Sequence, residues 1–139
     1  MNATVRTIDD VEAFELPNRT VREVFSGANG LAAGCAFRTV DVEPADGGAP
    51  RVPHTHAYME EIIVVARGQG VLWADGEWTR VSAGDAWIVP AGVPHATVNP
   101  GPGALRLYCF FSSARPEADY RELPESPLTD WRAAWAEGG

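Results

Sequence analysis

Short β-rich runs separated by turn residues are the feature that most constrains the fold of this 139-residue chain. Helical periodicity is nearly absent before residue 115, whereas Gly, Pro and Asp-Gly signals recur throughout that region. Roughly eight to ten runs in about 90 residues is the spacing of a β-sandwich or β-barrel. The runs predicted as strands are Val21–Phe25, Leu31–Val42 (interrupted near Gly34), Ile62–Ala66, Val71–Ala74, Glu77–Val81, Ala86–Val89, His95–Val98 and Leu105–Phe111.

Two local patterns support this assignment. Ile62–Ala66 is continuously apolar and rich in β-branched residues, which indicates a strand buried on both faces. The pair Asp75-Gly76 separates two of the predicted strands and is the strongest short signal for a β-hairpin. We therefore expect one all-β domain over residues 1–139, with a barrel core at about 21–111.

The C-terminal tail, residues 112–139, has a different pattern. Pro116–Pro127 is polar and bounded by prolines, which predicts a loop across the barrel surface. In the following segment Trp131 and Trp135 are four residues apart, so a short helix would place both rings on one face. We expect these rings to pack the helix on the barrel or on a second subunit, with ligand stacking as the alternative.

Composition narrows the classes of partner. Hydrophobic residues make up 45% of the chain and charged residues 22%, as in folded globular proteins. The net charge of −8 disfavours phosphate backbones and anionic lipid, so we expect no nucleic acid and no membrane partner. The start of the chain lacks a signal-peptide pattern, which predicts a cytoplasmic protein. In the cytoplasm Cys35 and Cys109 would be reduced core thiols, with a disulfide or a reactive thiol as the alternative.

All three histidines of the chain lie in the β-rich region. Residues i and i+2 of a strand point to the same side, so His54 and His56 would share one side of an extended segment. Pro53, just before His54, favours such a backbone because the proline ring fixes its own φ and keeps the preceding residue extended. His95 must come from a separate strand.

Glu61 is the carboxylate closest to this pair, but it lies five residues beyond His56. This odd offset would place it on the opposite face of one unbroken strand. The chain must therefore turn or bulge within Ala57–Met59 for Glu61 to join the histidines. Glu60 would then face outward, unless the two glutamates exchange roles.

Three imidazoles and a carboxylate form a mixed nitrogen and oxygen ligand set that suits Fe, Mn, Ni, Co, Cu or Zn. Four protein ligands leave one or two positions open on a five- or six-coordinate ion. An open position is what distinguishes a catalytic site from a closed structural one. The sequence therefore predicts one divalent transition metal ion with room for a further ligand.

Two spaced motifs around these residues resemble those of the cupin family. The first consists of Gly48, five residues, His54-Thr55-His56, four residues, Glu61, six residues and Gly68. The second consists of Gly84, five residues, Pro90-Ala91-Gly92, two residues, His95, three residues and Asn99. The motifs are separated by 15 residues, Gln69–Ala83.

The resemblance implies a double-stranded β-helix, a conical jelly-roll-like barrel of two antiparallel sheets with a metal inside. By this carry-over the ion, iron first and otherwise Mn, Ni, Zn, Co or Cu, would be held by His54, His56, Glu61 and His95. The motif glycines and Pro90 would be turn residues. Asn99 would be a structural hydrogen-bonding residue rather than a substrate contact.

Strand parity gives a partial view of the pocket lining. Ile63 and Val65 would lie on the Glu61 side of their strand and Thr97 on the His95 side, forming a mostly apolar floor.

In the last strand, two residue sets alternate, and either could face the pocket. One set is Arg106, Tyr108 and Phe110, and the other is Leu105, Leu107, Cys109 and Phe111.

Two tyrosines join Glu61 as candidate catalytic residues. Tyr108 belongs to the first of the alternating sets, and Tyr58 lies in the turn after His56. Together with Met59, Tyr58 would either line the mouth of the site or plug it. Three further aromatic residues are expected in the core or at a subunit contact rather than as ligand platforms: Trp73, Trp78 and Trp87.

We expect a metal-dependent enzyme acting on a small organic molecule, with dioxygenase-type chemistry favoured. The alternatives are a non-redox isomerase, cyclase, lyase or decarboxylase in a catabolic or natural-product pathway, and a non-catalytic ligand-binding or sensing module. A homodimer is the default assembly for such a barrel, with Val21–Phe25 and the tryptophan tail as candidate contacts.

Overall fold

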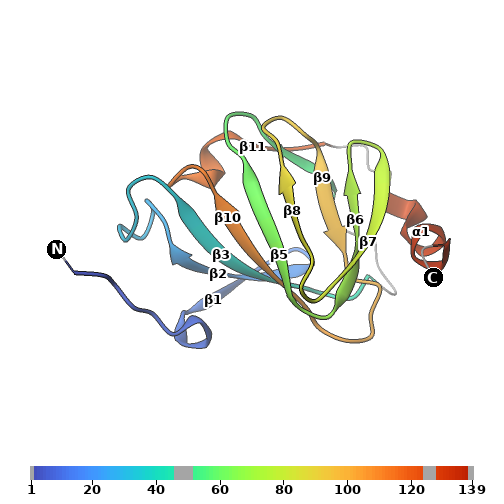
Figure 1. The fold of residues 1–139 in the computed structure, drawn as a ribbon, viewed down its shortest axis with the longest axis horizontal. Coiled ribbons are helices and arrows are strands. Elements are labelled where there is room, and N and C mark those ends of the chain that lie inside the picture. The colour runs from blue at the N-terminus through green and yellow to red at the C-terminus, as the bar shows by residue number, and fades with distance from the viewer. Residues whose placement is uncertain (1, 46–51, 124–127, 138–139) are drawn as a thin grey trace.

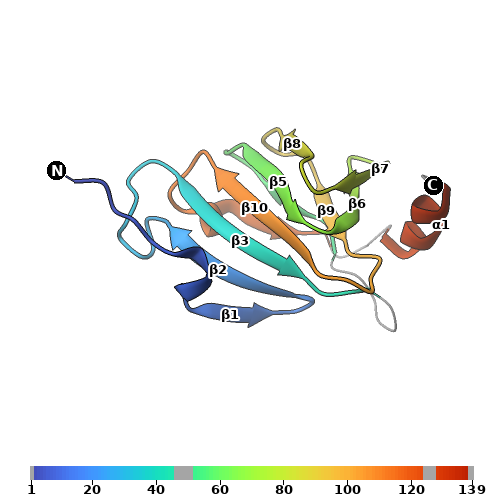
Figure 2. The same ribbon diagram turned by 60° about the horizontal axis from the view of Figure 1, so that its bottom comes forward.

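The computed structural model describes residues 2–45, 52–123 and 128–137, and it consists mainly of two antiparallel β-sheets. The sheets face each other across the barrel, with β1 and β2 splayed at one edge and the C-terminal helix at the other end (Figures 1 and 2). One sheet has the order β1-β2-β3-β10-β5-β8, and the other β11-β4-β9-β6-β7. This arrangement confirms the predicted all-β fold with its short C-terminal helix.

The elements have the following bounds. The six-stranded sheet contains β1 (Ala13–Leu16), β2 (Arg19–Phe25), β3 (Ala36–Val42), β5 (Glu61–Arg67), β8 (Ala86–Val89) and β10 (Leu105–Phe111). The five-stranded sheet contains β4 (His54–His56), β6 (Gln69–Ala74), β7 (Glu77–Ser82), β9 (His95–Val98) and β11 (Tyr120–Glu122). The helices are the 3-10 turns η1 (Ile8–Asp10), η2 (Pro116–Asp119) and η3 (Leu128–Asp130) and the α-helix α1 (Trp131–Glu137).

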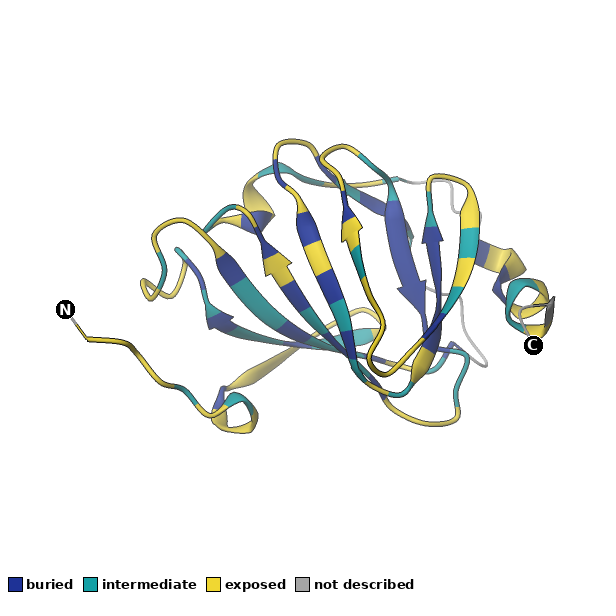
Figure 3. Ribbon diagram, in the orientation of Figure 1, coloured by how far each residue is buried: buried dark blue, intermediate teal, exposed yellow. Residues whose placement is uncertain are grey.

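Alternating burial along the strands shows which face of each sheet forms the core (Figure 3). In β5, Glu61, Ile63 and Val65 are buried, whereas Ile62 is 45% exposed. The prediction that this strand is buried on both faces was therefore wrong. Its outer face is open because an antiparallel sheet can leave one side in solvent.

A mostly exposed apolar row, in which only Phe37 is half-buried, crosses the outer face of the six-stranded sheet. Phe110 pairs with Phe37 of β3 on one side and with Ile62 of β5 on the other, and Ile62 pairs with Ile88 of β8. The two phenylalanine rings are stacked, with centroids 4.6 Å apart. We call Phe37, Phe110, Ile62 and Ile88 the outer row.

The β6–β7 hairpin confirms the Asp75-Gly76 prediction. Both turn residues have positive φ, 46° and 90°, as a two-residue turn of the primed type requires. The hairpin pairs Trp73 with Trp78 across the strands. Trp73 packs in a buried cluster with Trp131 of α1, and Trp78 and Trp135 flank that cluster. These rings therefore have the packing role that was expected of them.

Two strands had no recognised sequence signal. The first is β1, which pairs with β2. The second is β11, which pairs with β4 and lies in the segment that was predicted to be a loop. The loop prediction is corrected for residues 116–123, which form η2, β11 and their connections; residues 124–127 lie outside the described part of the chain. Among the described residues, no helix has the length and apolar character needed to span a membrane.

The cysteines and Asn99 are placed as follows. Neither cysteine is in a disulfide, but only Cys109 is buried; Cys35 is exposed, which corrects its assignment to the core. Asn99 is 2% exposed, and its amide nitrogen donates to the carbonyl oxygens of Val42 and Gly103. Its side-chain oxygen accepts from the Gly101 amide. Asn99 therefore has the structural role expected of it. Gly48, the first motif glycine, lies outside the described residues.

Gly68 and Gly84 provide a matched test of the turns that the motifs imply. Both have positive φ, 89° and 96°, so alanine at either position should cost about 1–2 kcal/mol in the free energy of unfolding. At Gly68 an added Cβ would also overlap the Ala104 carbonyl oxygen, whereas no atom lies within 4 Å of one added at Gly84. We expect Gly68→Ala to lose about 1–3 kcal/mol more than Gly84→Ala in urea unfolding. Equal losses would contradict the close approach.

Candidate metal centre

Three strands from both sheets bring the four predicted ligands together. In β4, His54 and His56 point to the same side, and His54 lies opposite His95 of the neighbouring strand β9. Glu61 begins β5, which belongs to the other sheet. The expected convergence of three imidazoles and one carboxylate is therefore present in the structure.

The position of Glu61 follows from a crossing between the sheets. After His56 the chain leaves the five-stranded sheet, passes through Ala57–Met59 and enters the six-stranded sheet at Glu61. The predicted turn is thus a change of sheet, and face parity no longer applies across it. Glu60 is exposed and Glu61 is 5% exposed, so the roles of the two glutamates are not exchanged.

The cluster is compact and almost fully buried. Each of the four residues offers one ligand atom, and these atoms all lie within 4.8 Å of one another. Glu61 Oε1 lies 3.0 Å from His95 Nε2 and 3.7 Å from His56 Nε2. The exposed fractions of the histidines are 7%, 5% and 2% for His54, His56 and His95.

Backbone carbonyls orient two of the imidazoles. His56 Nδ1 lies 3.2 Å from the Pro116 carbonyl oxygen, and His95 Nδ1 lies 3.0 Å from that of Val93. A carbonyl oxygen only accepts, so Nδ1 must carry the proton in both rings. The Nε2 atom of a neutral ring then presents a lone pair toward Glu61. Such outer hydrogen bonds are the usual support for histidines that bind metal.

This donor set fits a divalent cation. Two imidazole lone pairs and a carboxylate repel one another unless a proton or a cation lies between them. Burial lowers the pKa of His56, although Glu61 and Asp119 act in the opposite direction. The neutral ring, which is the form that binds metal, is thereby favoured. His54, His56, Glu61 and His95 could therefore hold one metal ion, whose identity the donor set does not specify.

Aromatic rings and a carboxylate surround the imidazoles. The Phe111 ring meets His56 edge-on, with centroids 5.3 Å apart, and the Tyr120 ring lies 5.0 Å from that of His54. Asp119 lies behind His56, with Oδ1 3.9 Å from Nδ1, and its other oxygen accepts from the Tyr58 backbone amide at 2.6 Å. These contacts restrict rotation of the rings.

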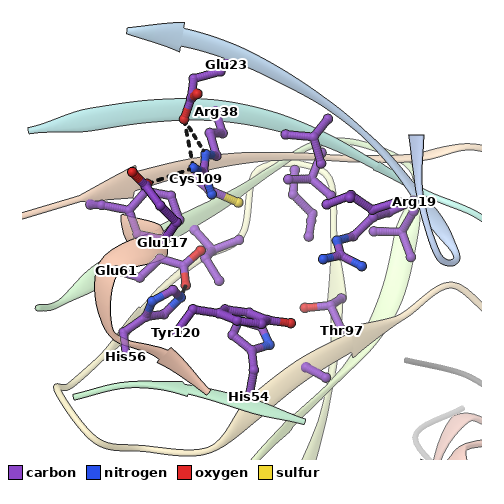
Figure 4. Close-up of a pocket in the computed structure, with 18 of the residues that line it drawn as sticks. Arg19, Glu23, Arg38, His54, His56, Glu61, Thr97, Cys109, Glu117 and Tyr120 are labelled. Carbon is purple, nitrogen blue, oxygen red and sulfur yellow. Dashed lines mark hydrogen bonds and ion pairs between the residues drawn. The ribbon is translucent and has the colours of Figure 1, made fainter. Parts of the chain in front are cut away.

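The cluster lines a cavity of about 440 Å³ between the sheets (Figure 4). Ile63 and Thr97 line it as strand parity predicted, whereas Val65 is buried without lining it. On β10 the inward set is Leu107, Cys109 and Phe111, which decides between the two sets that the sequence left open. The remaining apolar lining includes Phe14, Leu16, Val21, Val40, Val42 and Ala96.

The structure does not bring the two candidate tyrosines to the cavity. Tyr58 is 90% exposed in the turn after β4, so it neither lines nor plugs the site, while Met59 is buried in the core. Tyr108 faces outward from β10 and meets the Phe37 ring edge-on. Its neighbour on that face, Arg106, is bound by Asp41 and Asp9, whose hydrogen bonds raise the pKa of Arg106. We therefore remove Tyr58 and Tyr108 from the candidate catalytic residues.

Sequence reasoning missed several polar groups of the cavity. Tyr120 and Glu117 come from the tail, and Arg19, Glu23 and Arg38 come from β2 and β3. β11 has three residues, too few for a recognisable alternation, and the Pro116 carbonyl is a backbone group with no sequence signature. The inward charges on β2 and β3 break the apolar and polar alternation that identifies a core face. This break in the alternation is the sequence signal that could have identified Arg19, Glu23 and Arg38 as cavity residues.

Comparison with known proteins identifies related sequences. Residues 38–111, just over half of the chain, match the family model described as "Cupin domain". A curated relative from Methanocaldococcus jannaschii, "Uncharacterized protein MJ1618", is 32% identical over 62 residues, which cover 45% of this chain and 50% of that protein. The chain thus spans about half the length of the curated relative that it matches.

Solved structures share the fold at low identity. A protein from Planctomyces limnophilus has a TM-score of 0.70 at 17% identity, covering 86% of this chain and 96% of that one. KdgF from Halomonas sp. has a TM-score of 0.66 at 21% identity, covering 80% and 94%. Pac13 from Streptomyces, a nucleoside dehydratase, has a TM-score of 0.70 at 18% identity, covering 91% and 99%. At such identities the likeness shows the fold alone.

The Glu61→Gln variant tests whether Glu61 is a metal ligand or only a buried glutamate. In metal-free protein at pH 8 the neutral amide can donate to His95 Nε2, so we expect unfolding to cost about 1–3 kcal/mol more than in wild type. The same variant should bind a divalent ion at least ~100-fold more weakly, because it removes the charged ligand. Thermal unfolding with and without EDTA, and metal titration, measure the two effects.

Glu60→Gln is the matched control, since Glu60 is the adjacent glutamate and is exposed. Glu60→Gln should change neither the stability of the metal-free protein nor its affinity for the metal ion. Wild-type metal affinity in Glu61→Gln would remove Glu61 from the ligand set.

Proposed function

This chain belongs to the cupin family, and from that premise we propose that it is a metal-dependent enzyme acting on a small organic molecule. The observation that carries the proposal is that all four candidate ligands line the cavity between the sheets. Four protein ligands leave positions on a five- or six-coordinate ion for another molecule. A substrate held in the cavity can therefore reach the ion.

We propose dioxygenase-type chemistry at iron as the first version of this activity. A bound ion would supply Lewis acidity and, if redox-active, the ability to react with oxygen. The chain's own contribution is the wall around the site, where Ile63, Leu107 and Phe111 are buried apolar residues. Such a wall excludes water and strengthens electrostatic interactions within the cavity.

A non-redox elimination or isomerisation is the second candidate. The observation that favours it is a group beside the cluster that can exchange protons: the Tyr120 hydroxyl donates to Glu122 at 3.0 Å, and the Tyr120 ring lies over His54. A phenol bonded to a solvent-exposed carboxylate can take up or release a proton during turnover. The nucleoside dehydratase Pac13, with a similar fold, is an example of such chemistry on this architecture.

Loading the protein with either Fe(II) or Zn(II) separates these versions. With iron, oxygen uptake on a panel of small organic acids, phenols and nucleosides is expected for the dioxygenase version. Product formed equally well with redox-inert zinc favours the second candidate. In both cases His56→Ala should lower turnover at least ~100-fold, because an imidazole ligand is lost.

Tyr58→Phe is the control for this experiment, since the Tyr58 side chain is exposed outside the cavity. It should leave turnover unchanged. If neither ion supports turnover and ligands bind equally well without metal, the enzyme proposal fails and a binding or sensing module replaces it.

We also propose that the chain forms a homodimer, now through the outer row. The two segments that the sequence suggested as dimer contacts, Val21–Phe25 and the tryptophan tail, already pack within the subunit. β2 is paired on both edges, and Trp131 is buried against its own barrel. The outer row is uncharged, so two copies with a net charge of −8 can approach there with little local repulsion. Sheets pack face to face through such apolar rows.

Ile62→Lys tests this contact, because it places a charge in the centre of the outer row. We expect the mass measured by light scattering to fall from two chains to one, with a loss of dimer affinity of at least ~100-fold. Leu31→Lys, at an exposed leucine (42%) outside the outer row, is the control. A wild-type protein that is monomeric throughout would refute the proposed assembly.

A further inference from the structure

The segment that joins β4 to β5, residues 57–60, belongs to no strand. Side chains from the chain after β10 hold this segment in place. Ser112 Oγ accepts from the Glu60 backbone amide at 2.9 Å, and Asp119 Oδ2 accepts from the Tyr58 backbone amide at 2.6 Å. The spacing between the ligands of β4 and β5 therefore depends on hydrogen bonds that are supplied from outside both sequence motifs.

The two anchoring residues differ in what else they reach. Ser112 is exposed, and its own amide also donates to the Glu60 carbonyl oxygen at 3.1 Å. Asp119 instead reaches an imidazole, because its second oxygen, Oδ1, lies 3.9 Å from His56 Nδ1. The Asp119 side chain is only 12% exposed. One carboxylate thus meets both the joining segment and a candidate metal ligand.

The second oxygen of Asp119 is an unpaired acceptor. Asp119 Oδ1 is buried and has no hydrogen-bond partner within the described part of the chain. A buried acceptor without a partner destabilises the fold, so its presence calls for an explanation. The donor that faces it is His56 Nδ1, which lies 3.2 Å from the Pro116 carbonyl oxygen. One N–H group therefore faces two acceptors, both from η2.

Two acceptors behind Nδ1 favour the tautomer of His56 that carries its proton there. In Figure 4 the His56 ring is directed toward Glu61, and its Nε2 atom lies 3.7 Å from Glu61 Oε1. Nε2 must keep its lone pair to bind a cation, so the proton has to stay at Nδ1. The Nδ1–H group of a metal-bound imidazole is also a stronger donor, which a carboxylate behind it stabilises.

We infer that Asp119 is a positioning residue of the metal centre. Its Oδ2 atom fixes the segment between two ligands, and its Oδ1 atom favours the His56 tautomer whose Nε2 can bind a cation. Asp119 acts through His56 and the Tyr58 backbone, and it is not one of the residues that line the cavity. This inference rests on the metal centre of the proposed function and does not depend on turnover.

Asp119→Asn tests this inference, because asparagine has the shape of aspartate but offers one acceptor and one donor. If the amide oxygen accepts from the Tyr58 amide, the NH₂ group opposes His56 Nδ1–H, and the reverse orientation opposes Tyr58. We expect zinc affinity to fall about 10- to 100-fold in competition titrations. In metal-free protein at pH 8, ¹⁵N NMR should show His56 protonated at Nδ1 in wild type and partly at Nε2 in the variant.

Two controls isolate the two parts of this effect. Ser112→Ala removes a hydrogen bond to the same joining segment without facing an imidazole, so it should leave the His56 tautomer unchanged. Asp130→Asn makes the same chemical change at an exposed aspartate of the tail, so it should leave both the tautomer and zinc affinity unchanged.

Wild-type zinc affinity in Asp119→Asn would overturn the inference. A loss of affinity no larger than that of Ser112→Ala, with an unchanged tautomer, would also overturn it, because Asp119 would then be only an anchor. Should Asp119→Asn fail to fold, Asp119→Glu provides the second test, because it keeps two acceptor oxygens. His56 must then remain protonated at Nδ1, and loss of that proton to Nε2 would contradict the inference.

The outcomes separate this inference from the proposed function. A wild-type chain that binds no divalent ion would refute the proposed function, and the tautomer comparison would still decide whether Asp119 positions His56. Turnover by the wild type, together with wild-type zinc affinity and tautomer in Asp119→Asn, would support the enzyme and refute the inference.

Discussion

Burial of the Glu61 carboxylate among three imidazoles is the constraint on which the rest of this structure depends. A charge at 5% exposure is costly unless a proton or a cation compensates for it. The backbone carbonyls of Pro116 and Val93 hold the Nδ1 protons of His56 and His95. The Nε2 atoms are therefore left to the carboxylate, and the whole arrangement is balanced only when something positive is shared between them.

This constraint explains why the site needs both sheets. A single strand can present two imidazoles on one side, as β4 does, but a third and fourth ligand must come from other strands. The register between β4 and β9 supplies His95, and the crossing between sheets after His56 supplies Glu61. The cluster consequently links the two layers of the barrel, so ligand geometry and sheet packing depend on each other.

Features of the fold and the site that depend on local backbone geometry could be predicted from the sequence, whereas those that depend on tertiary contacts could not. The i, i+2 histidines, the required turn before Glu61 and the Asp75-Gly76 hairpin depend on local backbone geometry, and the sequence indicated all of them correctly. The side of β10 that faces the cavity depends on both neighbouring strands, so parity alone left the face with Tyr108 and the face with Cys109 as alternatives. Tyr120 reaches the site through a three-residue strand whose pairing with β4 is set by tertiary contacts.

The division of the cavity wall has a consequence for specificity. The candidate metal ligands come from β4, β5 and β9, within the two motifs, whereas the charged groups of the wall come from β2, β3 and the tail. Substitutions at Arg19, Glu23 or Glu117 would alter the charge presented to a bound molecule while leaving the imidazoles and their carbonyl partners in place. A barrel built in this way can keep one metal centre and change the molecules it accepts, because the chemistry and the recognition are supplied by different strands.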